Sequence, residues 1–154
     1  MIKPANILLV EDNPKDLKLA LHALRRNHLV NNVFTARDGE EALDFLFRRG
    51  GHAGRSAEDD PHVILLDLKL PKVTGLEVLR AIKASPELRR IPVVMLTSSR
   101  EENDLAASYD GGVNAYIVKP VDFEQFVEAM QIIGKHWLLL NEPPPNRKPN
   151  QENP

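Results

Sequence analysis

Short, unbroken runs of apolar residues alternate along this chain with longer segments in which apolar residues recur at helical spacing. Apolar runs without strict alternation are typical of strands that are covered on both faces, as in a parallel sheet. The pattern therefore predicts five strands, of which the second has the weakest apolar signal. They lie at Ile7–Val10, Val33–Ala36, Val63–Leu66, Val93–Leu96 and Ala115–Val118.

Signals for helix starts follow these runs. Asn13 and Pro14 predict an N-cap with proline at the first helical position. Other helix starts resemble the capping box, in which the cap residue and the residue three positions later each accept a hydrogen bond from the other's backbone N–H through their side chains. These pairs are Asp38 with Glu41, Thr74 with Glu77, and Asp122 with Gln125.

A further helix is expected to begin near Ser98 or Ser99 and to end at Gly111–Gly112, where glycine can adopt the left-handed conformation. Five repeats of strand and helix, joined by right-handed crossovers, predict a doubly wound α/β domain. The polar, Gly-rich residues 50–61 predict a surface loop, and the Pro-rich residues 141–154 predict a disordered or polyproline tail. We therefore expect one domain over residues 1–140, a tail over residues 141–154 and no output domain.

The composition excludes several classes of function. The chain has no cysteine, which rules out disulfides, thiolate metal sites and cysteine nucleophiles. A formal net charge of −2 gives no attraction to nucleic acid or to an anionic membrane. Arg48, Arg49 and Arg55 fall in a Gly-rich stretch that we expect to be exposed. No apolar run reaches the roughly 18 residues of a membrane span, and we therefore expect a cytoplasmic protein.

Polar residues follow directly after four of the five predicted strands. Glu11 and Asp12 follow the first strand and Asp67 the third, while Thr97 and Lys119 follow the fourth and fifth. Ligands of open α/β sheets bind at the carboxyl ends of the strands, so these side chains are expected at one edge. Three crowded carboxylates repel one another, and a hard divalent cation such as Mg²⁺ would resolve the conflict. The absence of His and Cys from these strand ends argues against zinc.

Metal, ammonium and hydroxyl groups together suit phosphoryl chemistry. A cation and Lys119 would neutralise the oxygens of a transferring phosphoryl group, and Thr97 would donate a hydrogen bond to one of them. Asp67, placed between two leucines, then makes sense as a nucleophile that forms an aspartyl phosphate. Ordinary structural roles are also open to each residue. These are helix caps for Asp12, Asn13 and Thr97, a loop acid at Glu11, and a structural salt bridge between Asp67 and Lys119.

The segments ILLVEDNP, VILLDLKLPKVTG, VVMLTSS and YIVKP occur in this order. With them the chain resembles, over about residues 5–140, the receiver domain of two-component response regulators. The resemblance implies a flavodoxin-like fold with strand order 2-1-3-4-5. It also implies that Asp67 accepts a phosphoryl group from the phosphohistidine of a histidine kinase, so that the chain is a signalling protein rather than an enzyme.

The resemblance further implies the ligands of Mg²⁺. Asp12, Asp67 and the backbone carbonyl of Lys69 would ligate the ion, while Glu11, a familiar variant of the aspartate at this position, would act mainly through bound water.

The same resemblance assigns a switch. Thr97 would supply the switch hydroxyl, Lys119 would keep the family's lysine role, and Tyr116 would turn inward when Thr97 is drawn to the phosphate. The segment LRRIPVVMLTSS and a Trp-containing last helix resemble stand-alone receivers that partner phytochrome-type histidine kinases.

The partner surfaces are expected on two helical faces. The first helix begins beside the acids and is the expected kinase-docking surface. The fourth helix, fifth strand and fifth helix form the expected switching face. The apolar run Trp137–Leu140 cannot all face inward from one helix, so we expect a homodimer contact that includes Trp137 and Leu140. A chain end folded back over the sheet edge is the alternative.

Two other functions fit the same fold. A pseudo-receiver would be an interaction module without phosphoryl transfer, against which the complete set of acidic, hydroxyl and lysine positions weighs. A phosphohydrolase would carry a second aspartate where this chain has Lys69, and a flavin protein would need a Ser-, Thr- or Gly-rich phosphate loop in place of EDNPKD.

Overall fold

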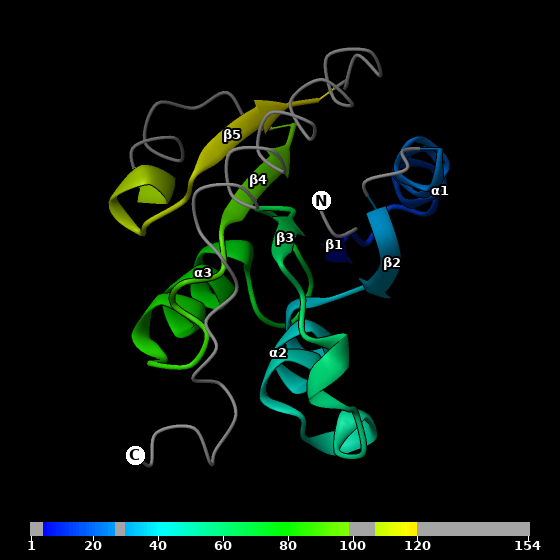
Figure 1. The fold of residues 1–154 in the computed structure, drawn as a ribbon. Coiled ribbons are helices and arrows are strands. Elements are labelled where there is room, and N and C mark those ends of the chain that lie inside the picture. The colour runs from blue at the N-terminus through cyan, green and yellow to red at the C-terminus, as the bar shows by residue number, and fades with distance from the viewer. Residues whose placement is uncertain (1–4, 27–29, 99–106, 120–154) are drawn as a thin grey trace, which may run out of the picture.

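Five parallel strands form one sheet with the order β2-β1-β3-β4-β5 (Figure 1). The computed structural model describes residues 5–26, 30–98 and 107–119. The predicted doubly wound α/β class and its strand order are confirmed. The strands are β1 (Ala5–Val10), β2 (Val30–Ala36), β3 (Val63–Leu66), β4 (Val93–Thr97) and β5 (Ala115–Val118).

Strand β2 is the one whose extent differs most from the prediction. It begins three residues earlier than the apolar run Val33–Ala36, and takes in the polar Asn31 and Asn32. The register with β1 shifts between the Ala5–Val30 and Ile7–Val33 pairs, so β2 holds one extra residue over Asn31 and Asn32, as a β-bulge does.

The helices begin where their cap residues predict. They are α1 (Pro14–Arg25), α2 (Gly39–Phe47) and α3 (Gly75–Ala84). Residues 107–110 are also helical, and the turn that follows contains Gly112 with a φ of 100°, the left-handed conformation expected there. The start of that helix and the Asp122–Gln125 pair lie outside the described residues.

The cap side chains make most of the expected hydrogen bonds. The Asn13 side-chain oxygen Oδ1 accepts from the backbone N–H groups of Lys15 and Asp16, at 2.9 and 3.2 Å. The Thr74–Glu77 capping box is complete. Asp38 accepts from the Glu41 N–H, but the Glu41 carboxylate accepts from Arg37 rather than from Asp38, so only half of that box forms.

Two apolar cores lie on opposite faces of the sheet. Alternate strand residues such as Leu8, Ile64 and Met95 pack with α2 and α3, and those between them, such as Leu9 and Leu65, pack with α1. The central strands are thus covered on both faces, which explains their unbroken hydrophobicity.

Residues 50–61 are mostly exposed, as predicted for a surface loop, and Arg55 from this stretch contacts the end of α2. They include two 3-10 turns, η1 (Gly50–His52) and η2 (Ala57–Asp59). The Arg55 guanidinium pairs with Asp60 at 2.8 Å, donates to the Phe45 carbonyl at 2.8 Å and lies 4.4 Å from the centre of the Phe45 ring. Its side chain is only 5% exposed, so the expectation that Arg55 is exposed is wrong. Charge, cation–π contact and helix-end carbonyls together compensate its burial.

His62 joins this segment to the amino end of β1. Its ring Nδ1 accepts the backbone N–H of Asn6 at 2.9 Å, and the backbone N–H of His62 donates to the Asn6 backbone carbonyl at 2.8 Å. Burial lowers the pKa of His62 below its usual range, against the opposing charge of Asp60. The accepting Nδ1 must be unprotonated, so the fold favours the neutral imidazole.

This arrangement predicts a loss of stability in acid. Because the unfolded chain binds the His62 proton more tightly than the fold does, the free energy of unfolding should fall as the pH drops below about 6.5. His62→Asn keeps an acceptor for Asn6 but cannot titrate. Urea unfolding at about pH 7.5 and pH 5 should show the variant losing about 1 kcal/mol less than the wild type, the size of one hydrogen bond. Equal losses would contradict this role, since His22 and His52 are present in both proteins.

Candidate functional site

Backbone pairing continues one residue beyond β1 and β3 and fixes the first acids of the site. The Glu11 N–H donates to the Ala36 carbonyl at 3.0 Å, and the Asp67 N–H donates to the Val10 carbonyl at 3.1 Å. Both residues therefore stand at the carboxyl edge of the sheet, where adjacent parallel strands end together.

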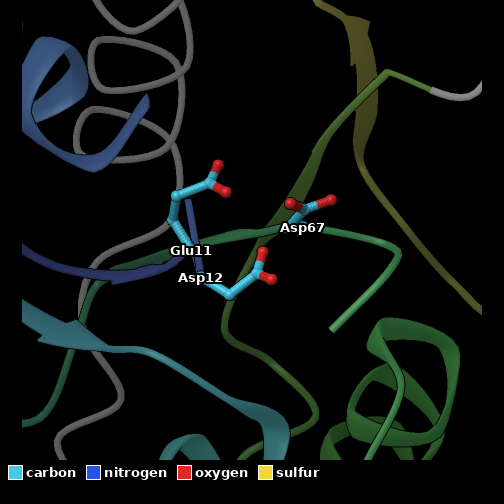
Figure 2. Close-up of side chains that lie close together, drawn as sticks. All are labelled: Glu11, Asp12 and Asp67. Carbon is cyan, nitrogen blue, oxygen red and sulfur yellow. The ribbon is translucent and has the colours of Figure 1, made fainter. Parts of the chain in front are cut away.

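Glu11, Asp12 and Asp67 bring their carboxylates to one place. Figure 2 shows these side chains extending from the ends of β1 and β3 with their carboxylate groups close together. One oxygen from each lies within 4.8 Å of the others. Glu11 and Asp67 are buried, at 3% and 6% exposure, whereas Asp12 is exposed. Two buried carboxylates beside a third need positive charge nearby.

Lys119 supplies positive charge from the residue directly after β5. Its Nζ lies 2.5 Å from Glu11 Oε1, 2.9 Å from Asp16 Oδ2 and 3.4 Å from Asp67 Oδ2. Burial alone lowers the pKa of Lys119, but the hydrogen bonds to Glu11 and Asp16 and the charge of Asp67 outweigh it and raise the pKa. The amine is therefore held in its charged form.

Glu11 carries the clearest sign of electrostatic crowding. Burial raises its pKa to about 7, and the negative charge of Asp67 adds to the rise, although the hydrogen bond from Lys119 lowers it. The other oxygen of Glu11 accepts the Asn13 N–H at 3.2 Å. Even with these partners the carboxylate is hard to keep ionised, so the site favours a further cation.

The donor set fits a hard divalent cation. Every candidate side-chain ligand in the cluster is a carboxylate oxygen, and Asp12 is open to solvent. Carboxylates with room for water are what Mg²⁺ and Mn²⁺ accept, whereas zinc prefers nitrogen and sulfur. The residues present thus fit the predicted magnesium.

Asp16 is a site residue that the pattern of strand ends did not reveal. It lies in the first turn of α1, four residues after Asp12, and its carboxylate contacts Lys119. The signal that could have found it is an acid in the first turn of a helix that starts at the carboxyl edge of the sheet. Its contact depends on the direction in which α1 leaves β1, and strand order does not specify that direction.

The remaining predicted site residues are only partly defined. Lys69 donates its N–H to Asp67 Oδ1 at 3.3 Å. Thr97 is the last residue of β4 and pairs in register with Val118, but its side chain is outside the described part of the chain. Tyr116 is half-buried on β5 and packs against the α2–α3 core. Trp137, Leu140 and the tail over residues 141–154 also lie outside the described residues.

A family model for the response regulator receiver domain matches residues 7–131. The chain belongs to this family. The sequence-based identification is thereby confirmed, and the five-stranded fold is the flavodoxin-like fold of its receiver-domain neighbours. Within residues 5–26, 30–98 and 107–119, no helix combines the length and apolar character needed to cross a bilayer.

This receiver is similar in sequence to two curated regulators. It is 44% identical to the probable methanogenesis regulatory protein FilR2 of Methanothrix harundinacea, over 92% of this chain and 88% of that protein. It is 41% identical to the response regulator Rcp1 of Synechocystis sp., over 88% of this chain and 90% of Rcp1.

Solved structures of phytochrome response regulators are also similar to this receiver. The bacteriophytochrome response regulator AtBRR is 60% identical, with a TM-score of 0.75 over 91% of this chain and 99% of AtBRR. The phosphorylated cyanobacterial phytochrome response regulator RcpA is 42% identical, with a TM-score of 0.75 over 89% of this chain and 95% of RcpA. Mn²⁺-bound Rcp1 is 40% identical, with a TM-score of 0.74 over 88% and 95%. The narrower resemblance to phytochrome-associated response regulators is thus confirmed.

Proposed function

We propose that this receiver accepts a phosphoryl group on Asp67 and signals through the resulting change in conformation. The observation that carries the proposal is the position of Asp67, a buried carboxylate 3.4 Å from the Lys119 amine and beside two further acids. A nucleophilic oxygen, a fixed cation and a set of metal-binding oxygens are the groups that phosphoryl transfer requires.

In the transfer step, an Asp67 carboxylate oxygen attacks the phosphorus of a phosphohistidine. A new P–O bond forms as the P–N bond breaks, and the bonding electron pair leaves with the imidazole nitrogen. Lys119 offsets the negative charge of the phosphoryl oxygens, and its donors are already directed toward the carboxylates of the site. Thr97, at the end of β4, would donate a hydrogen bond to one phosphoryl oxygen.

We assign the metal to the acidic cluster. Glu11 through water, Asp12, Asp67 and the Lys69 carbonyl would hold Mg²⁺. When bound, the ion would neutralise charge on the phosphoryl group and on the carboxylates. The Mn²⁺-bound form of Rcp1 supports the use of a divalent cation by a relative.

The proposed donor is a histidine kinase of the phytochrome type. Similarity to Rcp1, AtBRR and RcpA supports this choice, and RcpA has been seen in a phosphorylated form. The outgoing signal would pass from Thr97 and Tyr116 to the fourth helix, β5 and the fifth helix. We propose that the protein is cytoplasmic and forms a homodimer through the same face, including Trp137 and Leu140. We assign no nucleic-acid or membrane partner.

Phosphoryl uptake from a small donor tests the proposal without the kinase. The protein is incubated with phosphoramidate and Mg²⁺, and intact-mass spectrometry follows the gain of one phosphoryl group. We expect stoichiometric uptake with Mg²⁺ and at least about a tenfold slower uptake with excess EDTA, because the crowded acids then repel the incoming group.

The other outcomes separate the competing functions. No mass gain under either condition would favour a pseudo-receiver. Steady release of phosphate from varied phosphate esters would favour a phosphohydrolase.

A further inference from the structure

Lys119 has more carboxylate partners than phosphoryl transfer to Asp67 requires. An ammonium group has three N–H donors, and three carboxylates lie within 3.4 Å of this one. Glu11 and Asp67 belong to the acidic cluster at the strand ends, whereas Asp16 belongs to α1. Asp16 is thus the one partner among these three that the chemistry proposed above does not use.

Asp16 holds the lysine more closely than Asp67 does. The Lys119–Asp16 distance is 2.9 Å, against 3.4 Å between Lys119 and Asp67. Charge-assisted hydrogen bonds are strong near 2.9 Å and weaken as the distance grows. The ammonium therefore lies closer to Asp16 on α1 than to Asp67, while its shortest contact is to Glu11 at 2.5 Å.

The backbone of α1 fixes where the Asp16 carboxylate lies. The Asp16 N–H donates to the Asn13 side chain, and Pro14 begins the helix with a restricted φ. The Asp16 side chain is 36% exposed, whereas that of Glu11 is 3% exposed. Moving Lys119 away from Asp16 therefore costs little free energy, because water can solvate the Asp16 carboxylate. The buried Glu11 carboxylate would lose its partner without gaining water.

We propose that Asp16 is a positioning residue for Lys119, and that its carboxylate competes with an incoming phosphoryl group for the ammonium and slows transfer to Asp67. This inference rests on the proposed function. The residue acts through Lys119 and does not touch the reacting atoms. The contact also joins the first turn of α1 to the charge state of the site, because Lys119 leaves Asp16 as it turns to the phosphoryl oxygens.

The test compares initial rates of phosphoryl uptake from subsaturating acetyl phosphate with Mg²⁺. Asp16→Asn removes the charge and keeps the shape, and the rate should rise about three- to tenfold, the range expected for losing one partly exposed charge pair. Asp16→Glu restores the charge and should bring the rate back to within about twofold of the wild type. A fold defect would slow uptake and would not give this pattern. Asp16→Ser repeats the test should the asparagine variant unfold.

Two controls separate this role from a general effect of charge. Glu58→Gln removes one negative charge from an exposed residue of η2, whose backbone contacts Asn6 at the opposite, amino end of β1, and should leave the rate unchanged. In a Lys119→Gln background, Asp16→Asn should give no gain in rate.

Each result has a defined consequence. An unchanged or reduced rate in Asp16→Asn, with the wild type phosphorylated normally, would overturn the competition and leave the proposed function intact. A gain in the Lys119→Gln background would also overturn it. A wild type that takes up no phosphoryl group would overturn both proposals.

Discussion

Asp67→Asn is expected to reduce phosphoryl uptake from phosphoramidate to background. The amide of asparagine cannot form the acyl phosphate, and no other carboxylate takes the same position at the end of β3. The variant should fold, because Lys119 keeps Glu11 and Asp16 as partners and one of three crowded charges is removed.

Asp59→Asn is the matched control for this prediction. It makes the same chemical change in η2, which packs through its neighbours against Asn6 at the far end of β1, and uptake should equal that of the wild type. Intact-mass spectrometry measures both variants. Uptake by Asp67→Asn at a rate near that of the wild type would mean that another residue is the acceptor.

Gly75→Ala is expected to lower the free energy of unfolding by about 2–3 kcal/mol, as an overpacked substitution does. A Cβ on Gly75 would lie 2.2 Å from the Asp67 carbonyl oxygen and 2.7 Å from Leu68 Cα, and both are backbone atoms that cannot turn aside. The Gly75 N–H also donates to the Leu68 carbonyl at 2.8 Å. The start of α3 must therefore move away from the loop that carries Asp67.

Helix propensity alone predicts the opposite sign for this substitution. Alanine is favoured over glycine in helices by about 1 kcal/mol, so the contact with Asp67 decides the outcome. Gly54→Ala is the control, since a Cβ there meets nothing within 4 Å, and its stability should stay within about 0.5 kcal/mol of the wild type. Urea unfolding measures both. If the Gly75→Ala protein were as stable as the Gly54→Ala protein, the prediction would be wrong, because the backbone near Asp67 could then move at little cost in free energy.

The acidic cluster was predictable because parallel strands end at a common edge. Once Glu11 and Asp67 are placed directly after buried strands, pairing of the strands brings them together whatever the helices do. Lys119 follows by the same reasoning from β5. The structure places these side chains in contact, and their chemical roles remain predictions.

Contacts that depend on helix placement or on local folding were not predictable. Asp16 contacts Lys119 because α1 starts at the Asn13 cap and carries Asp16 in its first turn. Arg55 stands in a polar, Gly-rich stretch that suggests exposure, yet it reaches back ten residues to Phe45 and is buried. The need for glycine at position 75 arises from a backbone contact that no sequence pattern reports. In each case the contact joins two segments of the chain, and no repeating pattern of residue types in the sequence indicates that these segments meet.

Chemical mapping of the phosphorylated residue is the most direct measurement of the function proposed for this receiver. The wild-type protein is phosphorylated with phosphoramidate and Mg²⁺ and then treated with sodium borodeuteride, which reduces an acyl phosphate to a deuterium-labelled alcohol. Tandem mass spectrometry of its peptides should find labelled homoserine in place of Asp67 and nowhere else. Label at Asp12 or Asp16, or a phosphorylated protein with no reducible residue at position 67, would contradict the assignment of Asp67 as the phosphoacceptor.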